Sequence, residues 1–210
     1  MRKVPFVANS KDNMHCCPAV FRMVSGYYLG DKLSWKKIDE IMKSVPRKGT
    51  WTFPGLTYLA KKGLRVKNIE PVDYKKLYKE GPKYLYKVVG KDTADWYLQK
   101  SNIKDVISYI PEFLENVEQE TRRGTVEEIL EILKTGALVG IEVNSRILNK
   151  RSGFNLHFIL LYDFNGKNIT LHDPGLPGIK ARKISIKDLR NAFNFPGSNG
   201  GITIFESAGK

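Results

Sequence analysis

The 210-residue sequence is poor in cysteine: it has only two, Cys16 and Cys17, and they are adjacent. Neighbouring cysteines cannot join distant parts of the chain, and a disulfide between them would be strained by the geometry of the S–S bond. A disulfide framework is therefore excluded, which is typical of a protein from a reducing compartment. Cysteine in this chain serves either packing or chemistry.

Long apolar segments are also missing. No stretch approaches the roughly 20 consecutive apolar residues of a transmembrane helix. The basic N-terminus, residues 1–6, is not followed by the apolar region of a signal peptide. We therefore expect a cytoplasmic protein without a transmembrane segment. Because 41% of the residues are hydrophobic and no repeat interrupts the chain, one domain over 1–210 is expected.

Acidic residues are fewer than basic ones, 22 against 35, which gives a formal net charge of +13. Such a charge would suit a nucleic-acid or membrane partner, but it also serves solubility alone. The lysines and arginines are spread over the whole chain and carry no recognisable RNA- or DNA-binding motif. No specific nucleic-acid partner is therefore expected, and a nucleic-acid-binding domain is the last-ranked function.

Apolar residues in the first two thirds of the chain recur mostly at the 3.6-residue period of a helix. The first such segment covers residues 16–29. Ser34 is placed to cap a second helix, and the spacing of Thr125–Glu128 is that of a capping box. Further helices are predicted over 52–62 and, with breaks at proline and glycine, over about 73–118, and a strand over 64–69.

Strand patterns dominate the remainder. Asn165-Gly166 lies between two apolar segments and is a strong signal for a hairpin turn. Ser185 begins one more short helix by its capping pattern. The predicted strands cover 137–143, 156–164, 168–172 and 201–205. Helices followed by mostly antiparallel strands are typical of the α+β class.

Cys16 stands where the first helix should begin. A helix N-terminus favours negative charge, and a thiolate is the nucleophilic form of cysteine. Pro18 falls in the first turn, where its missing N–H does no harm. Local sequence alone thus makes Cys16 a candidate nucleophile, although a lone cysteine is more often a small buried hydrophobe.

A histidine and a carboxylate would complete such a site. His157 opens an apolar strand directly after a polar loop, and it follows Cys16 by about 140 residues, within the roughly 130–150 of papain-type pairs. Asp173 ends the next strand, so the hairpin should bring it close to His157. Cys16, His157 and Asp173 are therefore the predicted catalytic residues. The other histidines, His15 and His172, are expected to be exposed neighbours.

Several motifs together resemble the papain-like cysteine peptidase clan. They are Val4-Pro5-Phe6, Cys16-Cys17-Pro18-Ala19, Gly153 to His157, and Leu171 to Gly175, with the 52–66 segment in support. Within the clan the chain is most similar to the bacteriocin-leader-processing peptidase-like family, which cuts after a double-glycine leader. The resemblance implies an N-terminal helical lobe with the cysteine at a helix start and a C-terminal, mostly antiparallel sheet carrying the histidine and aspartate. Residues of about 72–124 have no counterpart and are expected to form a helical insertion.

Two positions depart from the family pattern. Cys17 replaces the usual glycine after the nucleophile, so Cys17 itself is a second candidate nucleophile. The family also has a glutamine about six residues before the cysteine, where it serves as an oxyanion donor. In this sequence, residues 8–13 contain no glutamine. Asn9 is the expected substitute, with Ser10 or Asn13 as alternatives. Loss of such a donor lowers the catalytic rate by a factor of about 10²–10³.

The function expected from these residues is a cysteine peptidase or related thiol hydrolase that cleaves an amide bond in a peptide or protein. Acyl transfer to an amine would use the same residues. The alternative is a catalytically inactive papain-like module that binds a peptide or an anionic partner. No metal and no organic cofactor is expected. Because no transporter segment is attached, the double-glycine specificity is not carried over.

Overall fold

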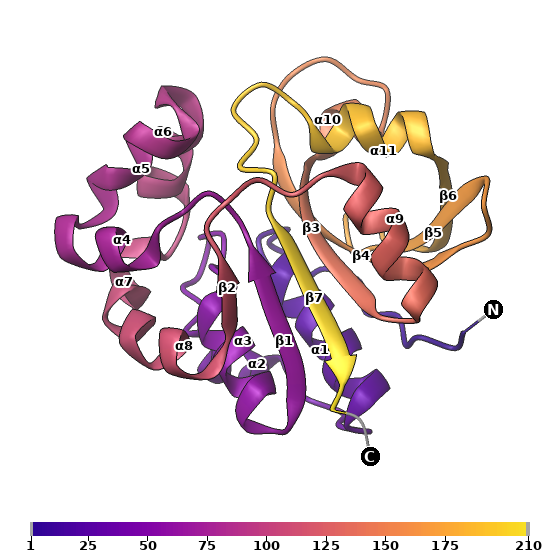
Figure 1. The fold of residues 1–210 in the computed structure, drawn as a ribbon, viewed down its shortest axis with the longest axis horizontal. Coiled ribbons are helices and arrows are strands. Elements are labelled where there is room, and N and C mark those ends of the chain that lie inside the picture. Colours follow the sequence, from indigo (N-terminus) through magenta and orange to yellow (C-terminus); the bar gives the residue numbers. More distant parts are fainter. Residues whose placement is uncertain (1, 209–210) are drawn as a thin grey trace.

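A seven-stranded sheet crosses the molecule in the computed structural model, which describes residues 2–208 (Figure 1). The strand order is β2-β1-β7-β3-β4-β5-β6, and only β1 and β2 run parallel. The strands are β1 (Leu64–Ile69), β2 (Glu118–Glu120), β3 (Leu138–Asn144), β4 (Leu156–Phe164), β5 (Asn168–Asp173), β6 (Ile179–Ser185) and β7 (Ile202–Ser207). The predicted α+β class is therefore confirmed.

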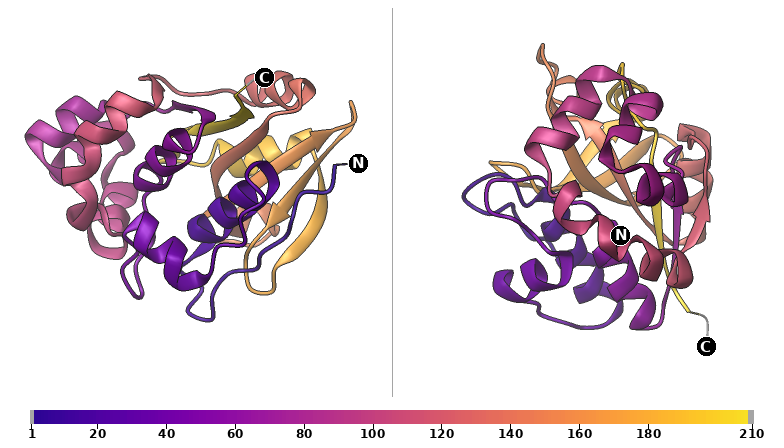
Figure 2. Two further views of the ribbon diagram at one scale, coloured as in Figure 1. Left: turned by 90° about the horizontal axis from the view of Figure 1, so that it is seen from below. Right: turned by 90° about the vertical axis from the view of Figure 1, so that its left-hand side faces the viewer.

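Helices cover both faces of this sheet (Figures 1 and 2). The α-helices are α1 (Cys16–Tyr28), α2 (Trp35–Met42), α3 (Phe53–Lys61), α4 (Tyr74–Glu80), α5 (Leu85–Val89), α6 (Lys91–Lys100), α7 (Ile103–Val106), α8 (Ile110–Asn116), α9 (Val126–Thr135), α10 (Ser145–Leu148) and α11 (Ile186–Phe193). Short 3₁₀ turns cover Pro82–Tyr84 and Ile107–Tyr109. Helices α1 and α3 pack on one face, and α9 and α11 pack on the other.

Each face has its own hydrophobic core, because side chains alternate along a strand. On β3, Leu138 belongs to the core under α1, whereas Val139 and Ile141 belong to the core under α9 and α11. The β4 strand behaves in the same way: Leu160 and Ile159 lie on opposite sides. Burial on both faces makes these strands continuously apolar in sequence.

The helix that begins at Cys16 is held by its apolar side. Ala19, Val20, Met23 and Val24 are all completely buried, which agrees with the predicted 3.6-residue period. Phe21 packs edge-on against Phe205 of β7, with ring centroids 5.7 Å apart. The predicted helix 16–29 is confirmed as Cys16–Tyr28.

The capping predictions are also confirmed. The Ser34 side chain accepts a hydrogen bond from the backbone of Lys37, and Ser185 does the same for Asp188. Thr125 and Glu128 form a full reciprocal capping box at the start of α9. Capping involves residues three positions apart, so the local sequence is enough to find it.

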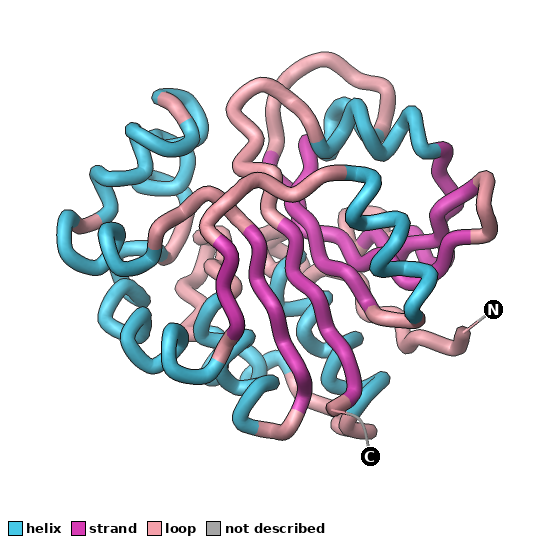
Figure 3. Tube along the Cα trace, viewed as in Figure 1, coloured by secondary structure: helices cyan, strands magenta, loops and turns pink. Residues whose placement is uncertain are grey.

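The stretch that was predicted to be mostly helical contains α4 to α8 and lies together at one end of the molecule (Figures 1 and 3). Its expected status as an insertion stays a prediction. Strand β6 was missed, because its sequence, IKARKIS, is basic and largely exposed. The three-residue strand β2 was missed as well; it begins where the stretch predicted to be helical ends. None of the helices within residues 2–208 is long and apolar enough to cross a membrane.

We expect Phe21→Ala to reduce the free energy of unfolding by about 3–5 kcal/mol, measured by urea denaturation, because the ring is 1% exposed and its loss leaves a cavity under α1. Tyr78→Ala is the matched control. Its ring is 53% exposed, so the change should stay within about 0.5 kcal/mol. A Phe21→Ala loss as small as that of the control would contradict the packing described for α1.

Candidate active site

Cys16 is the first residue of α1 and is partly exposed, whereas Cys17 is 3% exposed. Burial, followed by the charges of Cys16 and Glu142, raises the pKa of Cys17 well above 9.0. A thiol of this kind is a weak nucleophile, since the thiolate is the reactive form. Of the two candidates, Cys16 is therefore better placed for chemistry.

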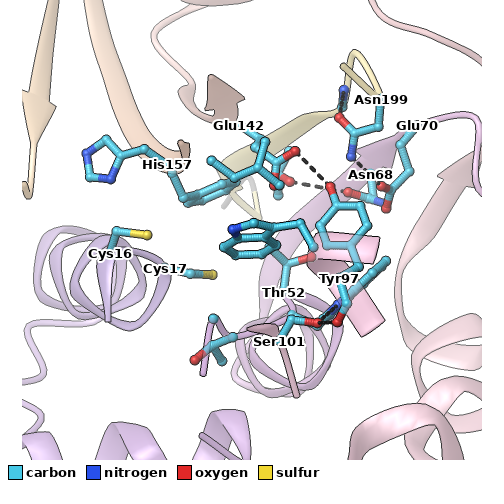
Figure 4. A pocket seen from close by; sticks show the side chains of 18 residues that line it. Cys16, Cys17, Thr52, Asn68, Glu70, Tyr97, Ser101, Glu142, His157 and Asn199 are labelled. Carbon is cyan, nitrogen blue, oxygen red and sulfur yellow. Dashed lines mark hydrogen bonds between the residues drawn. The ribbon is translucent and has the colours of Figure 1, made fainter. Parts of the chain in front are cut away.

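The structure brings His157 and Asp173 together from adjacent strands. His157 is the second residue of β4, and Asp173 is the last residue of β5. The imidazole Nε2 lies 2.7 Å from Asp173 Oδ1, and both side chains are buried. His157 and Cys16 line the same pocket, and the His157 ring lies beside the N-terminal end of α1 (Figure 4).

Asp173 is held in place by two further groups. Arg182 Nη1 lies 2.8 Å from Asp173 Oδ2, and the Gly175 backbone donates to Oδ1 at 3.0 Å. Arg182 is itself fixed, because it donates to Asn149 Oδ1 at 2.9 Å and to the Leu148 carbonyl at 2.7 Å. A Cβ atom at position 175 would lie only 3.1 Å from Asp173 Oδ1, so glycine allows this close approach.

These contacts decide the charge of the pair. Burial opposes a positive charge on His157, but the interactions with Asp173 and Cys16 outweigh it and raise its pKa from 6.5 to about 10. For Asp173, burial alone would raise the pKa; the hydrogen bond with His157, its positive charge, Gly175 and Arg182 lower it from 3.8 to about 2. At neutral pH the two groups therefore form an ion pair.

The loop before α1 contains Asn9, the predicted oxyanion donor. Its Oδ1 accepts hydrogen bonds from the backbones of Ser10 and His15, at 2.9 and 2.8 Å. Its Nδ2 donates to Asn13 Oδ1 at 3.1 Å. The Asn9 backbone donates to the Pro174 carbonyl at 2.6 Å, which ties this loop to the turn after Asp173. Asn9 is not among the residues that line the pocket, so its role as an oxyanion donor stays a prediction.

The expectation that His15 and His172 are exposed is wrong. His15 is 8% exposed and contacts Asp12 and Ser10 through Nδ1, at 2.9 and 2.8 Å. His172 is 1% exposed: it contacts the Val4 carbonyl through Nε2 and accepts a hydrogen bond from the Ala181 backbone. His15 Nε2 also lies 3.4 Å from Asp39 of α2, and His172 joins β5 to the N-terminal segment, contacts that the position of each residue in the sequence could not reveal.

The pocket beside Cys16 runs between the helices and the sheet and contains about 670 Å³ of empty space, part of it open to solvent (Figure 4). Aromatic side chains, Trp51, Trp96, Tyr97 and Phe158, line it. Two carboxylates, Glu70 and Glu142, lie on the side away from Cys16 (Figure 4). The sequence pattern predicted no role for either glutamate or for Arg182. No local motif marks Glu142, whose partner Tyr97 lies 45 residues away in the chain. Arg182 likewise contacts Leu148 and Asn149, which precede β4.

Two solved structures resemble the chain over almost its whole length. One is a double glycine motif protease from an AMS/PCAT transporter in complex with the leader peptide, with 16% identity, a TM-score of 0.50, and coverage of 98% of this chain and 92% of that one. The other is the peptidase domain of Streptococcus ComA, a bifunctional ABC transporter involved in a quorum-sensing pathway. It has 13% identity, a TM-score of 0.51, and coverage of 97% and 98%.

At this level of identity the similarity shows the fold. The chain has the papain-like fold of double-glycine peptidase domains, as the sequence motifs predicted. No protein-family model matches the sequence, and no curated protein matches it.

We expect His157 to titrate with a pKa of about 10 in NMR spectra recorded over roughly pH 5 to 11. In Asp173→Asn the pKa should fall markedly, because burial then opposes the charge with less compensation. His172 is the internal control, since burial lowers its pKa below 6.5. A His157 pKa near 6.5 in both proteins would contradict the ion pair.

The same shifts predict how the pair contributes to stability. The His157 contribution is complete below pH 6.5 and is lost as the pH rises through about 10. The Asp173 contribution is present above pH 3.8 and is lost as the pH falls through about 2. Urea denaturation across pH should therefore show a smaller difference between the wild type and Asp173→Asn at both extremes. A difference that does not vary with pH would contradict this linkage.

Proposed function

We propose that this protein is a cysteine peptidase or related thiol hydrolase that cleaves an amide bond of a peptide. The single observation that carries the proposal is the placement of His157 between Asp173 and the Cys16 end of α1, at the mouth of a pocket. A papain-like fold agrees with it, and one structure of this fold holds a leader peptide.

In the proposed reaction, the thiolate form of Cys16, beside the imidazolium of His157, attacks the carbonyl carbon of the substrate. The C–N bond then breaks, and the amine leaves with the proton from His157. Neutral His157 then takes a proton from water, which attacks the thioester; the acid leaves, and the Cys16 thiolate and the His157 imidazolium are restored. Asp173 keeps its hydrogen bond to the imidazole and stabilises the imidazolium.

Negative charge develops on the carbonyl oxygen during the attack. The backbone N–H of Cys16 is available for it, because the first residues of a helix have no intrahelical acceptor. The Asn9 amide would be the second donor, but one of its two N–H groups donates to Asn13 and the residue does not line the pocket. The position of Asn9 outside the pocket lining is the observation that favours the second candidate, a papain-like module that binds a peptide without cleaving it.

We expect Cys16 to be alkylated by iodoacetamide at about pH 6.5, where an ordinary thiol with a pKa of about 8.5 is mostly protonated. The reason is the imidazolium beside its sulfur. Mass spectrometry of digested protein would locate the label and give the rate for each cysteine. The rate at Cys16 should fall by at least about tenfold in His157→Ala.

Cys17→Ala is the matched control, because Cys17 is buried and should not carry the reaction. Slow and equal labelling of both cysteines would contradict the proposal. A reactive Cys16 without cleavage of any peptide in a mixed fluorogenic library would favour the non-cleaving module instead. Cleavage that Cys16→Ala abolishes and Cys17→Ala retains would support the peptidase.

A further inference from the structure

The pocket beside Cys16 has an unusual charge balance for a protein of net charge +13. Two carboxylates, Glu70 and Glu142, line it. Within residues 2–208, no lysine or arginine lines the pocket, and neither glutamate forms a salt bridge. The only basic residue of the described chain that lines the pocket is His157, which pairs with Asp173.

The two carboxylates differ in how well the protein satisfies them. Glu70 accepts hydrogen bonds from Asn68 and Tyr74 at Oε1 and from Asn199 at Oε2, the last at 3.3 Å. Glu142 has one bond, from the Tyr97 hydroxyl to Oε1 at 2.7 Å. No hydrogen bond within the described residues reaches its Oε2, and the side chain is half-buried in the pocket wall. This oxygen is therefore available to a group that enters the pocket.

The surroundings make a negative charge on Glu142 unfavourable while the pocket is empty. Burial raises its pKa, the Tyr97 hydrogen bond lowers it, and the charge of Glu70 raises it, with the result at about 7. A cation placed between the two carboxylates would remove this cost, because an opposite charge stabilises the ionised form.

The walls of the pocket also suit a cation. Trp51 and Trp96 line it, and both rings pack against Tyr97, with centroids 5.0 and 5.8 Å away. The Trp51 ring is fixed by a 2.9 Å hydrogen bond from Nε1 to Ser101 Oγ. Tryptophan faces attract lysine and, more often, arginine side chains. Flat aromatic walls with carboxylates at the far end therefore fit a long basic side chain.

The position of the pocket connects it with the proposed chemistry. Cys16 and His157 line its other side (Figure 4). The charge of Glu142 reaches the neighbouring residue Cys17, whose pKa it helps to raise. A side chain that reaches Glu142 would thus belong to a residue next to the bond presented to Cys16.

From these observations we propose that the pocket binds an arginine or lysine side chain of the substrate, and that Glu142 recognises its positive charge. This inference rests on the proposed function, because it assigns a specificity to the same site. It predicts cleavage beside a basic residue, in contrast to a site shaped for glycine alone.

The test uses two chloroacetamide probes of equal length, one ending in a guanidinium group and one in a neutral urea. Each alkylates a thiol with loss of chloride. At equal concentration, the cationic probe should label Cys16 about ten- to hundredfold faster than the urea, because charged hydrogen bonds in a pocket are worth this much. The ratio should fall to about one in Glu142→Gln, whose amide oxygen still accepts from Tyr97.

Glu131→Gln is the control for net charge, because Glu131 is on the exposed side of α9 and pairs with the exposed Lys134. It should keep the wild-type ratio. Equal labelling of Cys16 by both probes in the wild type would overturn the cation pocket and leave the thiol chemistry standing. A preference that persists in both Glu142→Gln and Glu70→Gln would also overturn it.

A Cys16 that reacts with neither probe would count against the proposed function instead. Calorimetry with agmatine then tests cation binding in the pocket independently of Cys16, because binding requires no reaction at the thiol. Agmatine that binds the wild type at least about tenfold more tightly than Glu142→Gln supports the inference. Agmatine that binds neither protein, or both equally, overturns it.

Discussion

The hydrogen bond between His157 and Asp173 is the contact on which the geometry of the site depends. It joins the entrance of β4 to the end of β5, and it exists because these strands pair over a single hairpin. Arg182 reaches the same carboxylate from β6, and the loop before α1 is tied to the following turn through Pro174. Two strands that follow each other closely in the chain, β4 and β6, and the much earlier loop before α1 therefore meet around the end of β5.

Asp173 and Glu142 show how surroundings decide the charge of similar groups. Asp173 faces Arg182 and the imidazolium of His157, and its pKa falls to about 2. Glu142 faces the Tyr97 hydroxyl and a second carboxylate, and its pKa rises to about 7. Desolvation acts on both groups, so the presence or absence of a nearby cation makes the difference. Asp173 is paired with positively charged groups of the protein itself, whereas Glu142 has no salt-bridge partner among the described residues.

The papain-like fold explains why these two environments lie close to the same cysteine. Helix α1 packs on β4 of the sheet, and the pocket opens where its first turn meets the strand entrances. One wall comes from the sheet, with Glu142 on β3 and Phe158 on β4. The other wall comes from the helical part, which supplies Trp96 and Tyr97 of α6. The helical stretch between β1 and β2 thus contributes directly to the pocket.

The sequence by itself determined the local elements and the candidate residues Cys16, His157 and Asp173. Helix periods, caps and the Asn165-Gly166 hairpin depend on residues a few positions apart, so they can be recognised in one dimension. Tertiary structure alone decided the burial of His15 and His172, the contacts of Asn9, and the environments of Arg182 and Glu142. The surroundings of His172 and Glu142 depend on strand order and on contacts between residues far apart in the chain. The contacts of Asn9 and His15 depend on how the irregular loop before α1 folds, for which the sequence has no periodic pattern.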